Sequence, residues 1–325
     1  MRKRHLLMLL LAISLSAKKK NPDEETQTLA LPKDPPPVAV GETARLIFNV
    51  SPLSVKGLLS QQTRDAMKAL LKANGGVPMV HIRAFVAGSG DVRRVPQIVS
   101  EVLTEKKLPL PSVSVVLGGS LLLDNAQVVL EAISNGRRDA NPSGLEFVAG
   151  EEATADDPLA PPQPLLEKAV SQLAAKVNAA AVVQVSCFVS TMNNATQLMS
   201  TIQSRFPGAA VDLVQTRRAP LHALANCEAV ARGDKLKAER LAFTGTRVSS
   251  GSAEKDATLA FQRLDRDLTE AGAPPANIFF TNIYALSDQA AAVSRKRRTP
   301  DATILVEGLA AMDAGFAVDA VATVN

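Results

Sequence analysis

Aromatic residues, histidine and cysteine are scarce in this chain of 325 residues. Ten Phe, one Tyr and no Trp are present, so the interior must be built mainly from small aliphatic side chains. The three His and two Cys show no zinc-ligand spacing. No P-loop, no G-x-S-x-G elbow and no complete dinucleotide fingerprint occurs. These absences exclude the familiar metal, nucleotide and serine-hydrolase motifs, and we expect no cofactor.

Basic charge is concentrated at the N-terminus. The whole chain carries a formal charge of +4, and residues 1–20 hold six Lys and Arg and no acid, so the remainder carries −2. The basic cluster elsewhere is "SRKRR" at residues 294–298. Binding of single-stranded nucleic acid needs a basic track with stacking aromatics, and this chain lacks both. We therefore expect no nucleic-acid partner and a solvated loop at 294–298.

The first residues have the layout of a secretory signal peptide. In "MRKRHLLMLLLAISLSAKKK" a basic start precedes an apolar run and then small residues. The run is about half of the ~20 residues that span a membrane, so a permanent anchor is the lesser alternative. A disordered, apolar N-terminal tail on a cytosolic protein is another alternative. We predict a signal peptide at 1–17, a charged and proline-containing linker at 18–43, and a periplasmic or secreted protein without membrane contact after cleavage.

A short pattern occurs three times at nearly constant spacing. Residues 128–134, 225–231 and 316–322 read "VVLEAIS", "ANCEAVA" and "FAVDAVA". Their acids Glu131, Glu228 and Asp319 stand 97 and 91 positions apart. An internal repeat at a fixed period decides the fold, so it takes priority over other signals.

Further landmarks recur at the same period. Phe48, Phe147 and Phe243 lie in short opening strands and are 99 and 96 positions apart. Each is followed by a segment with helical periodicity, an apolar strand, a second helical stretch, a proline and two β-rich runs. Apolar residues at helical spacing predict the first and third long helices: Ala66, Leu70 and Ala73, and Leu259, Leu264 and Leu268, with Gly272 as a stop. We predict repeats at 44–138, 143–233 and 239–325.

The repeat resembles the RidA superfamily, whose members are also labelled YjgF-like or endoribonuclease L-PSP. The third copy carries the pattern best, with "FTGTRVSSGS", "LDRDLTEAGAPPANIFFTNIYALSD" and "FAVDAVATV", and the first contributes "QQTRDAMKALLKANGG". The resemblance implies an α+β fold of three chorismate-mutase-like units. Such units form homotrimers with ligand pockets between subunits, so three tandem copies imply an intramolecular pseudo-trimer. We expect a monomeric chain with a small-molecule ligand in the clefts between repeats.

The resemblance also implies a catalytic pair, of which only one member is present. Active relatives hydrolyse enamines and imines, with an Arg two residues after a proline clamping the substrate carboxylate. At this position the chain has Val113, Ala209 and Ala302. Shifting the alignment by one residue in either direction places no basic residue there. The acid that positions water corresponds to Glu131, Glu228 and Asp319.

Two sets of alternatives stay open for these side chains. The acids are either retained catalysts or exposed residues on an amphipathic closing strand. Arg83, Arg217 or Arg218 could replace the missing clamp, although an Arg on a strand usually faces solvent with a buried stem.

Cys187 and Cys227 fall on the middle and closing strands of the second repeat, which the resemblance makes neighbours. They are either two small buried apolar residues or, in an oxidising compartment, a disulfide.

The function predicted from the sequence has two forms. The favoured form is an exported RidA-like protein that lacks the carboxylate clamp and serves as a small-molecule-binding or structural descendant. The alternative is a deaminase-type hydrolase that acts on a substrate without a carboxylate. Whether the chain is an enzyme stays open at this point.

Overall fold

A computed structural model describes residues 38–41, 46–87, 92–135, 144–218, 222–233 and 240–324. The predicted signal peptide lies outside these residues, as does most of the predicted linker. The described residues belong to one unit that begins at Pro32. Within them, no helix is both long and apolar enough to cross a membrane.

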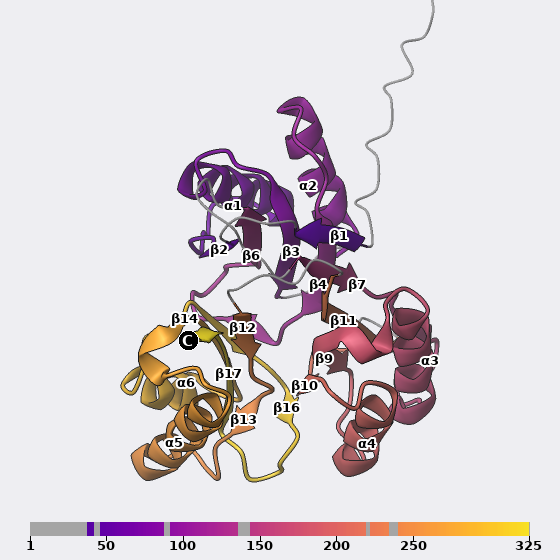
Figure 1. The fold of residues 1–325 in the computed structure, drawn as a ribbon. Coiled ribbons are helices and arrows are strands. Elements are labelled where there is room, and N and C mark those ends of the chain that lie inside the picture. Colours follow the sequence, from indigo (N-terminus) through magenta and orange to yellow (C-terminus); the bar gives the residue numbers. More distant parts are fainter. Residues whose placement is uncertain are drawn as a thin grey trace, which may run out of the picture. The chain divides into compact units, whose positions relative to one another are not determined.

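The same order of elements occurs three times (Figure 1). Each repeat has an opening strand, a long helix, a middle strand, a second helix, a strand parallel to the middle one, and a closing strand. The first comprises β2 (Leu46–Val50), α1 (Leu59–Ala73), β3 (Met79–Val86), α2 (Arg94–Glu105), β4 (Ser112–Leu117), β5 (Ser120–Leu121) and β6 (Val128–Asn135). The second comprises β7 (Leu145–Ala149), β8 (Ala153–Ala155), α3 (Pro162–Ala174), η1 (Ala179–Ala181), β9 (Val182–Val189), α4 (Ala195–Arg205), β10 (Ala210–Gln215) and β11 (Ala223–Arg232). The third comprises β12 (Arg240–Phe243), β13 (Arg247–Val248), α5 (Glu254–Glu270), η2 (Pro275–Asn277), β14 (Ile278–Ala285), α6 (Asp288–Arg295), β15 (Ala302–Leu305), β16 (Gly308–Leu309) and β17 (Phe316–Val324).

The three sheets have the same strand order. The closing strand lies between the opening and middle strands, giving β2-β6-β3-β4, β7-β11-β9-β10 and β12-β17-β14-β15. The middle strand and the strand after the second helix are parallel, because a helix connects them; the other pairs in this order are antiparallel. A further strand, β1 (Val38–Gly41), pairs with β7 and lies inside the segment predicted as a linker.

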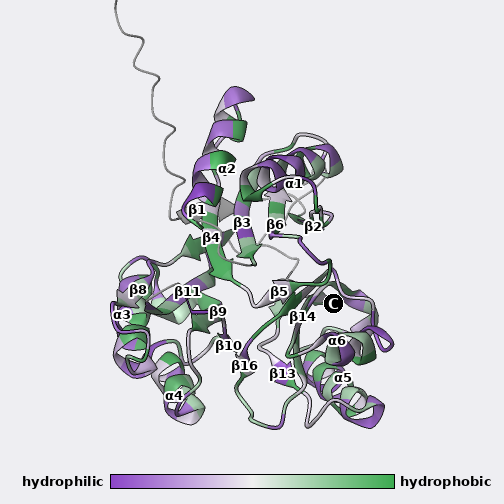
Figure 2. Ribbon diagram, turned by 180° about the vertical axis from the view of Figure 1, so that it is seen from behind, coloured by the Kyte–Doolittle hydropathy of each residue, from purple (hydrophilic) through white to green (hydrophobic). Residues whose placement is uncertain are grey.

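Period-two alternation gives each sheet two different faces. In the first repeat Ile82, Ala84 and Val86 pack with the helices, while Arg83 and Phe85 lie on the opposite face. Each repeat has a helix-facing core of its own, and the strands carry most of the green, hydrophobic colour in Figure 2. A separate cluster joins the opposite faces of the three sheets and contains Phe85, Phe188 and Tyr284.

Three equivalent hydrogen bonds close the repeats into a ring. Leu117, Gln215 and Leu305 occupy the same register position in β4, β10 and β15. The residue two places after each donates its backbone N–H to the next copy: Gly119 to Leu305 O at 2.8 Å, Glu307 to Gln215 O at 3.1 Å, and Arg217 to Leu117 O at 3.2 Å. The fold is therefore α+β, with three repeats arranged as an intramolecular pseudo-trimer.

The helices predicted from apolar spacing are present, but two of the marked residues are misplaced. Ala73 is exposed at the last position of α1, and Leu259 is 46% exposed on α5. Phe261 instead lies on the buried face of α5. Gly272 follows the end of α5 with a φ of +78°, a conformation that favours glycine, so the predicted stop is confirmed.

Candidate functional site

The three acids at the repeated position occupy equivalent places in the sheets. Glu131 pairs with Arg83, Glu228 with Ser186, and Asp319 with Asn282. All three acids are buried, with exposures of 5%, 6% and 3%. They lie on the faces that meet between the repeats, so the alternative of exposed acids on an amphipathic strand is wrong. We call these three pairs, together with Ser114, Asp212 and Ala302 beside them on the parallel strands, the polar layer.

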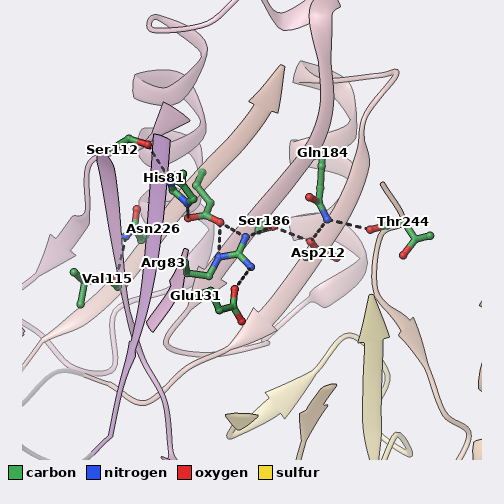
Figure 3. Close-up of polar contacts among 11 residues, drawn as sticks. His81, Arg83, Ser112, Val115, Glu131, Gln184, Ser186, Asp212, Asn226 and Thr244 are labelled. Carbon is green, nitrogen blue, oxygen red and sulfur yellow. Dashed lines mark hydrogen bonds and ion pairs between the residues drawn. The ribbon is translucent and has the colours of Figure 1, made fainter. Parts of the chain in front are cut away.

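Arg83 is the centre of the polar layer (Figure 3). Its Nε donates to Glu228 Oε1 at 2.6 Å, and its Nη2 donates to the same oxygen. Weaker contacts of 3.4 Å join Nη1 to Glu131 Oε2 and Nη2 to Ser186 Oγ. The guanidinium carbon also lies 5.9 Å from the ring centres of Phe85 and Phe188. The cation is thus held by two carboxylates, a hydroxyl and two aromatic faces.

Polar contacts continue from this centre across all three repeats. On one side His81 Nε2 lies 3.6 Å from Glu228 Oε2, and its Nδ1 lies 2.7 Å from Ser112 Oγ. On the other side Ser186 Oγ donates to Asp212 Oδ2 at 2.7 Å. Gln184 Nε2 donates to Asp212 Oδ2 at 3.0 Å and to Thr244 O at 3.1 Å (Figure 3). The network therefore ties the first, second and third copies to one another.

The acids of the polar layer differ in protonation. Burial disfavours the charge of Glu228, but Arg83 and His81 outweigh burial and hold its pKa below the usual range. Burial raises the pKa of Glu131 from 4.5 to about 7 despite Arg83. Burial likewise raises the pKa of Asp319 from 3.8 to about 7, and that of Asp212 well above its usual value, where Asp319 adds repulsion. Near neutral pH, Glu228 is the firm counter-ion of Arg83.

A pocket leads from solvent to the polar layer. We call it the axial pocket, because equivalent residues of all three copies line it. Its rim is apolar and includes the half-buried Phe48, Phe243, Ile133 and Val230. Its floor contains Arg83, His81, Gln184, Asn282, Glu131, Glu228 and Asp319. The interior measures about 40 Å³, room for roughly three water-sized groups.

The far side of the polar layer is sealed by aromatic rings. Phe85, Phe188 and Tyr284 lie two residues further along the three middle strands and are each no more than 2% exposed. The Phe85 ring is 6.3 Å from Phe188 and 6.2 Å from Tyr284, both in edge-to-face contact. The aromatic rings therefore close the axial pocket on the side opposite its rim.

No arginine stands at the position that the resemblance gives to the carboxylate clamp. The register corrects the alignment, because Ser114 and Asp212 are the structural equivalents of Ala302, rather than Val113 and Ala209. Arg83 is engaged by Glu228 and Glu131, so it is not free to clamp a ligand carboxylate.

A second hollow of about 360 Å³ lies between the second and third repeats. Met199, Gln203 and Val211 line one side, and segment 242–247 with α5 lines the other. Arg247 Nε donates to Asp267 Oδ2 at 2.5 Å inside it. We call it the pairwise cleft; none of the three acids at the repeated position lines it.

Cys187 and Cys227 are directly opposite in β9 and β11 and form a disulfide. Both lie in the helix-facing core of the second repeat, on the other face of the sheet from Glu228. The disulfide therefore does not border the axial pocket.

Basic side chains of the cluster at 294–298 contact polar side chains of α5. Lys296 Nζ lies 2.6 Å from Glu254 Oε1, Arg297 donates to Thr258, and Arg298 lies 4.0 Å from Asp265. Among the residues that the structure describes, no group of His, Cys, Asp and Glu has the arrangement of a metal site.

Sequence reasoning found the acids of this site but missed their partners. His81, Gln184 and Asn282 were not recognised, and Arg83 was named only as a possible replacement for the missing clamp. A signal did exist: Arg83, Ser186 and Asn282, at one position of the three mainly apolar middle strands, are all polar. A polar residue repeated at one place on a buried face indicates a shared polar interior.

Comparison with known proteins supports the fold. No family model matches the chain, and no curated protein matches it. Among solved structures, a chorismatase is similar at 9% identity over 86% of this chain and 99% of that chain, with a TM-score of 0.50. A cyanuric acid hydrolase from A. caulinodans follows at 11% identity over 86% and 100%, TM-score 0.42, and T. maritima PurL complexed with FGAR at 10% identity over 88% and 75%, TM-score 0.31. At such identities the likeness concerns architecture, and it places this α+β chain of three mixed sheets beside chorismatase in fold.

Proposed function

We propose that the chain is a RidA-superfamily descendant that binds a small molecule in the axial pocket and does not hydrolyse 2-imino acids. The observation that carries this proposal is the occupancy of Arg83. The only arginine on the pocket floor, among the residues described, is neutralised by Glu228 at 2.6 Å. A substrate carboxylate would have to displace this buried partner, which costs the full desolvation of a carboxylate.

The shape of the axial pocket supports ligand binding. Small-molecule sites are concave and mostly apolar, with a few polar groups that fix the orientation of the ligand. Here the polar groups lie at the floor and the apolar groups at the rim. Groups with perturbed pKa values are common at functional sites, and the pKa values of Glu131 and Asp319 on the pocket floor are both raised.

A second candidate is favoured by those same two acids. A general acid or base works best with a pKa near the working pH, and the pKa of both Glu131 and Asp319 is raised to about 7. A deaminase-type hydrolase acting on a neutral imine would use either acid to activate water. This keeps a catalytic role for Glu131 and Asp319 as a proposal of its own, whereas Glu228 is engaged as the counter-ion of Arg83.

Ammonia release separates the two candidates. The purified full chain is offered a freshly generated 2-imino acid and then a neutral imine. We expect no ammonia above background from either. Release from the neutral imine that disappears in Glu131→Gln and Asp319→Asn would establish the hydrolase instead. Release from the imino acid would contradict both candidates, because it requires a carboxylate clamp.

The place of binding is tested with two filling variants. Hits from a thermal-shift screen of small amines, alcohols and carboxylates are measured again on Val230→Phe, at the rim of the axial pocket, and on Gln203→Phe, in the pairwise cleft. We expect the first variant to lose binding and the second to keep it. The reverse result would move the ligand to the pairwise cleft.

We further propose that the chain is exported and monomeric. The disulfide supports an oxidising compartment, since such bonds are rare where thiols are kept reduced. N-terminal sequencing of the expressed protein is expected to show loss of about 17 residues, as the signal-peptide pattern predicts. Light scattering is expected to give the mass of one chain, because the ring of repeats is already closed.

A further inference from the structure

The floor of the axial pocket has more hydrogen-bond acceptors than donors. Three oxygens on its side chains have no hydrogen-bond donor among the described residues: Glu131 Oε1, Asn282 Oδ1 and Asp319 Oδ2. These side chains belong to residues that are only 2–5% exposed. Buried acceptors in proteins are nearly always paired. The floor is therefore suited to a guest that donates several hydrogen bonds at once.

Charge favours the same kind of guest. Three carboxyl groups border the pocket against one guanidinium, and that guanidinium already donates to Glu228, Glu131 and Ser186. An anion would meet uncompensated acceptors, whereas a cation would meet carboxylates in a site of low dielectric. A bare metal ion fits less well, because no metal-type cluster exists among the described residues.

Size and wall chemistry narrow the guest further. The interior of about 40 Å³ accepts a compact head group, and the rim presents aromatic and aliphatic carbon. A protonated amino group offers three N–H donors and one positive charge. Resting on the ligand binding proposed above, we propose that the axial pocket binds a small protonated amine. Glu131 Oε1, Asn282 Oδ1 and Asp319 Oδ2 accept its N–H groups, and its hydrocarbon part lies against the rim.

Three isosteric probes test the proposal on the full chain at pH 8 by titration calorimetry. They are isobutylammonium, isobutanol and isovalerate, which share a branched carbon skeleton and differ in the head group. We expect the amine to bind at least tenfold more tightly than the alcohol, and the carboxylate to show no binding. Equal binding of amine and alcohol would overturn the amine assignment and leave ligand binding at the pocket intact. If the amine does not bind but another compound does, and Val230→Phe abolishes binding of that compound, only the amine assignment fails. If no compound binds, both the amine assignment and the proposed ligand binding are overturned.

Two matched variants locate the head group. Asp319→Asn removes a floor carboxylate and is expected to weaken the amine at least tenfold while leaving alcohol binding unchanged. Asp212→Asn is the control, since Asp212 lies in the same polar layer but is bonded by Ser186 and Gln184 and does not line the pocket. Its amine affinity is expected to stay within about twofold. Equal losses in both variants would contradict the assignment, and Glu131→Gln serves if Asp319→Asn does not fold.

Discussion

At the scale of single residues, the buried arginine of the polar layer forms an internal ion pair, and no arginine stands at the position that the resemblance assigns to a substrate clamp. The position that the resemblance assigns to an arginine is Ser114, Asp212 or Ala302, while the arginine of this region, Arg83, lies on a neighbouring strand. Its guanidinium donates to Glu228, Glu131 and Ser186. A buried arginine of this kind stabilises the packing of the repeats only as long as its carboxylate partner is present.

Removal of that partner is therefore expected to be costly. Glu228→Gln leaves the charge of Arg83 buried without a full counter-ion, and we expect a loss of about 3–5 kcal/mol in unfolding free energy at pH 7. Glu131→Gln is the matched control: its carboxyl is only partly ionised at pH 7 and lies 3.4 Å from Arg83. Urea denaturation measures both variants. An equal loss in the two would show that Glu228 is not the principal partner.

The pH dependence of stability follows from the raised acids. Glu131 has a pKa of about 7 in the folded chain and an ordinary value of 4.5, so its contribution is complete below about pH 4.5 and is lost as the pH rises through 7. Asp319 acts in the same direction, whereas Glu228, with a lowered pKa, loses its contribution below about pH 4.5. The charged and titratable groups around them are Arg83, His81, Asp212, Tyr284 and Asp301.

We therefore expect unfolding free energy to be greatest near pH 5 and to fall toward pH 8, with Glu131 contributing about 3 kcal/mol and Asp319 acting in the same direction. Thermal and urea unfolding between pH 5 and 8 measure this slope. Glu131→Gln should flatten it. A wild-type stability that rises steadily from pH 5 to 8 would contradict the raised pKa values.

At the scale of elements, the alternation of residues along each strand could be predicted from the sequence, but what each face of the sheet packs against could not. The recurring Phe48, Phe147 and Phe243 do occupy one register position, opposite Ile133, Val230 and Val321. Alternation also puts Arg83 and Phe85 on one face of β3. It cannot tell whether that face meets solvent or another sheet, because this depends on contacts between repeats far apart in sequence. The sequence therefore left Arg83 between two alternatives, a solvent-facing residue and a replacement for the clamp.

The disulfide belongs to this scale because it joins two elements of one sheet. It closes a loop of 40 residues between β9 and β11. The double variant Cys187→Ala/Cys227→Ala is expected to lose roughly 2–4 kcal/mol, since the unfolded chain regains loop entropy. Ligand binding at the axial pocket should persist, because both sulfurs lie on the helix-facing side. Urea denaturation and calorimetry check the two parts. A variant of unchanged stability, or the detection of two free thiols in the unreduced wild-type protein, would contradict the bond.

At the scale of the whole molecule, the repeat period predicted three copies, the resemblance implied their fold, and the contacts between repeats provide the site. Each copy supplies a similar sheet, but only the ring of three creates the polar layer, in which Arg83 of the first copy meets Glu228 of the second. Asn282 and Asp319 of the third copy complete the floor. Tandem linkage allows one arginine to contact acids of two copies while the other two copies have no arginine at that position, an asymmetry that identical subunits of a homotrimer cannot have.

The junction between the second and third copies depends on a glycine. A side chain at Gly245 would place its Cβ 2.4 Å from Val211 O and 2.7 Å from Val211 N, while Thr246 N donates to Val211 O at 3.2 Å beside it. We expect Gly245→Ala to lower unfolding free energy by about 1–3 kcal/mol, because backbone on both sides must separate. Gly208→Ala is the control, since nothing lies within 4 Å of the added Cβ there. Urea denaturation is followed by secondary structure, and ligand binding at the axial pocket is measured on the same variants. We expect Gly245→Ala to lose both stability and binding, and Gly208→Ala to keep both. A variant with full stability and binding would mean that the third copy tolerates displacement from the second, and that the ring of repeats does not form the pocket as a unit.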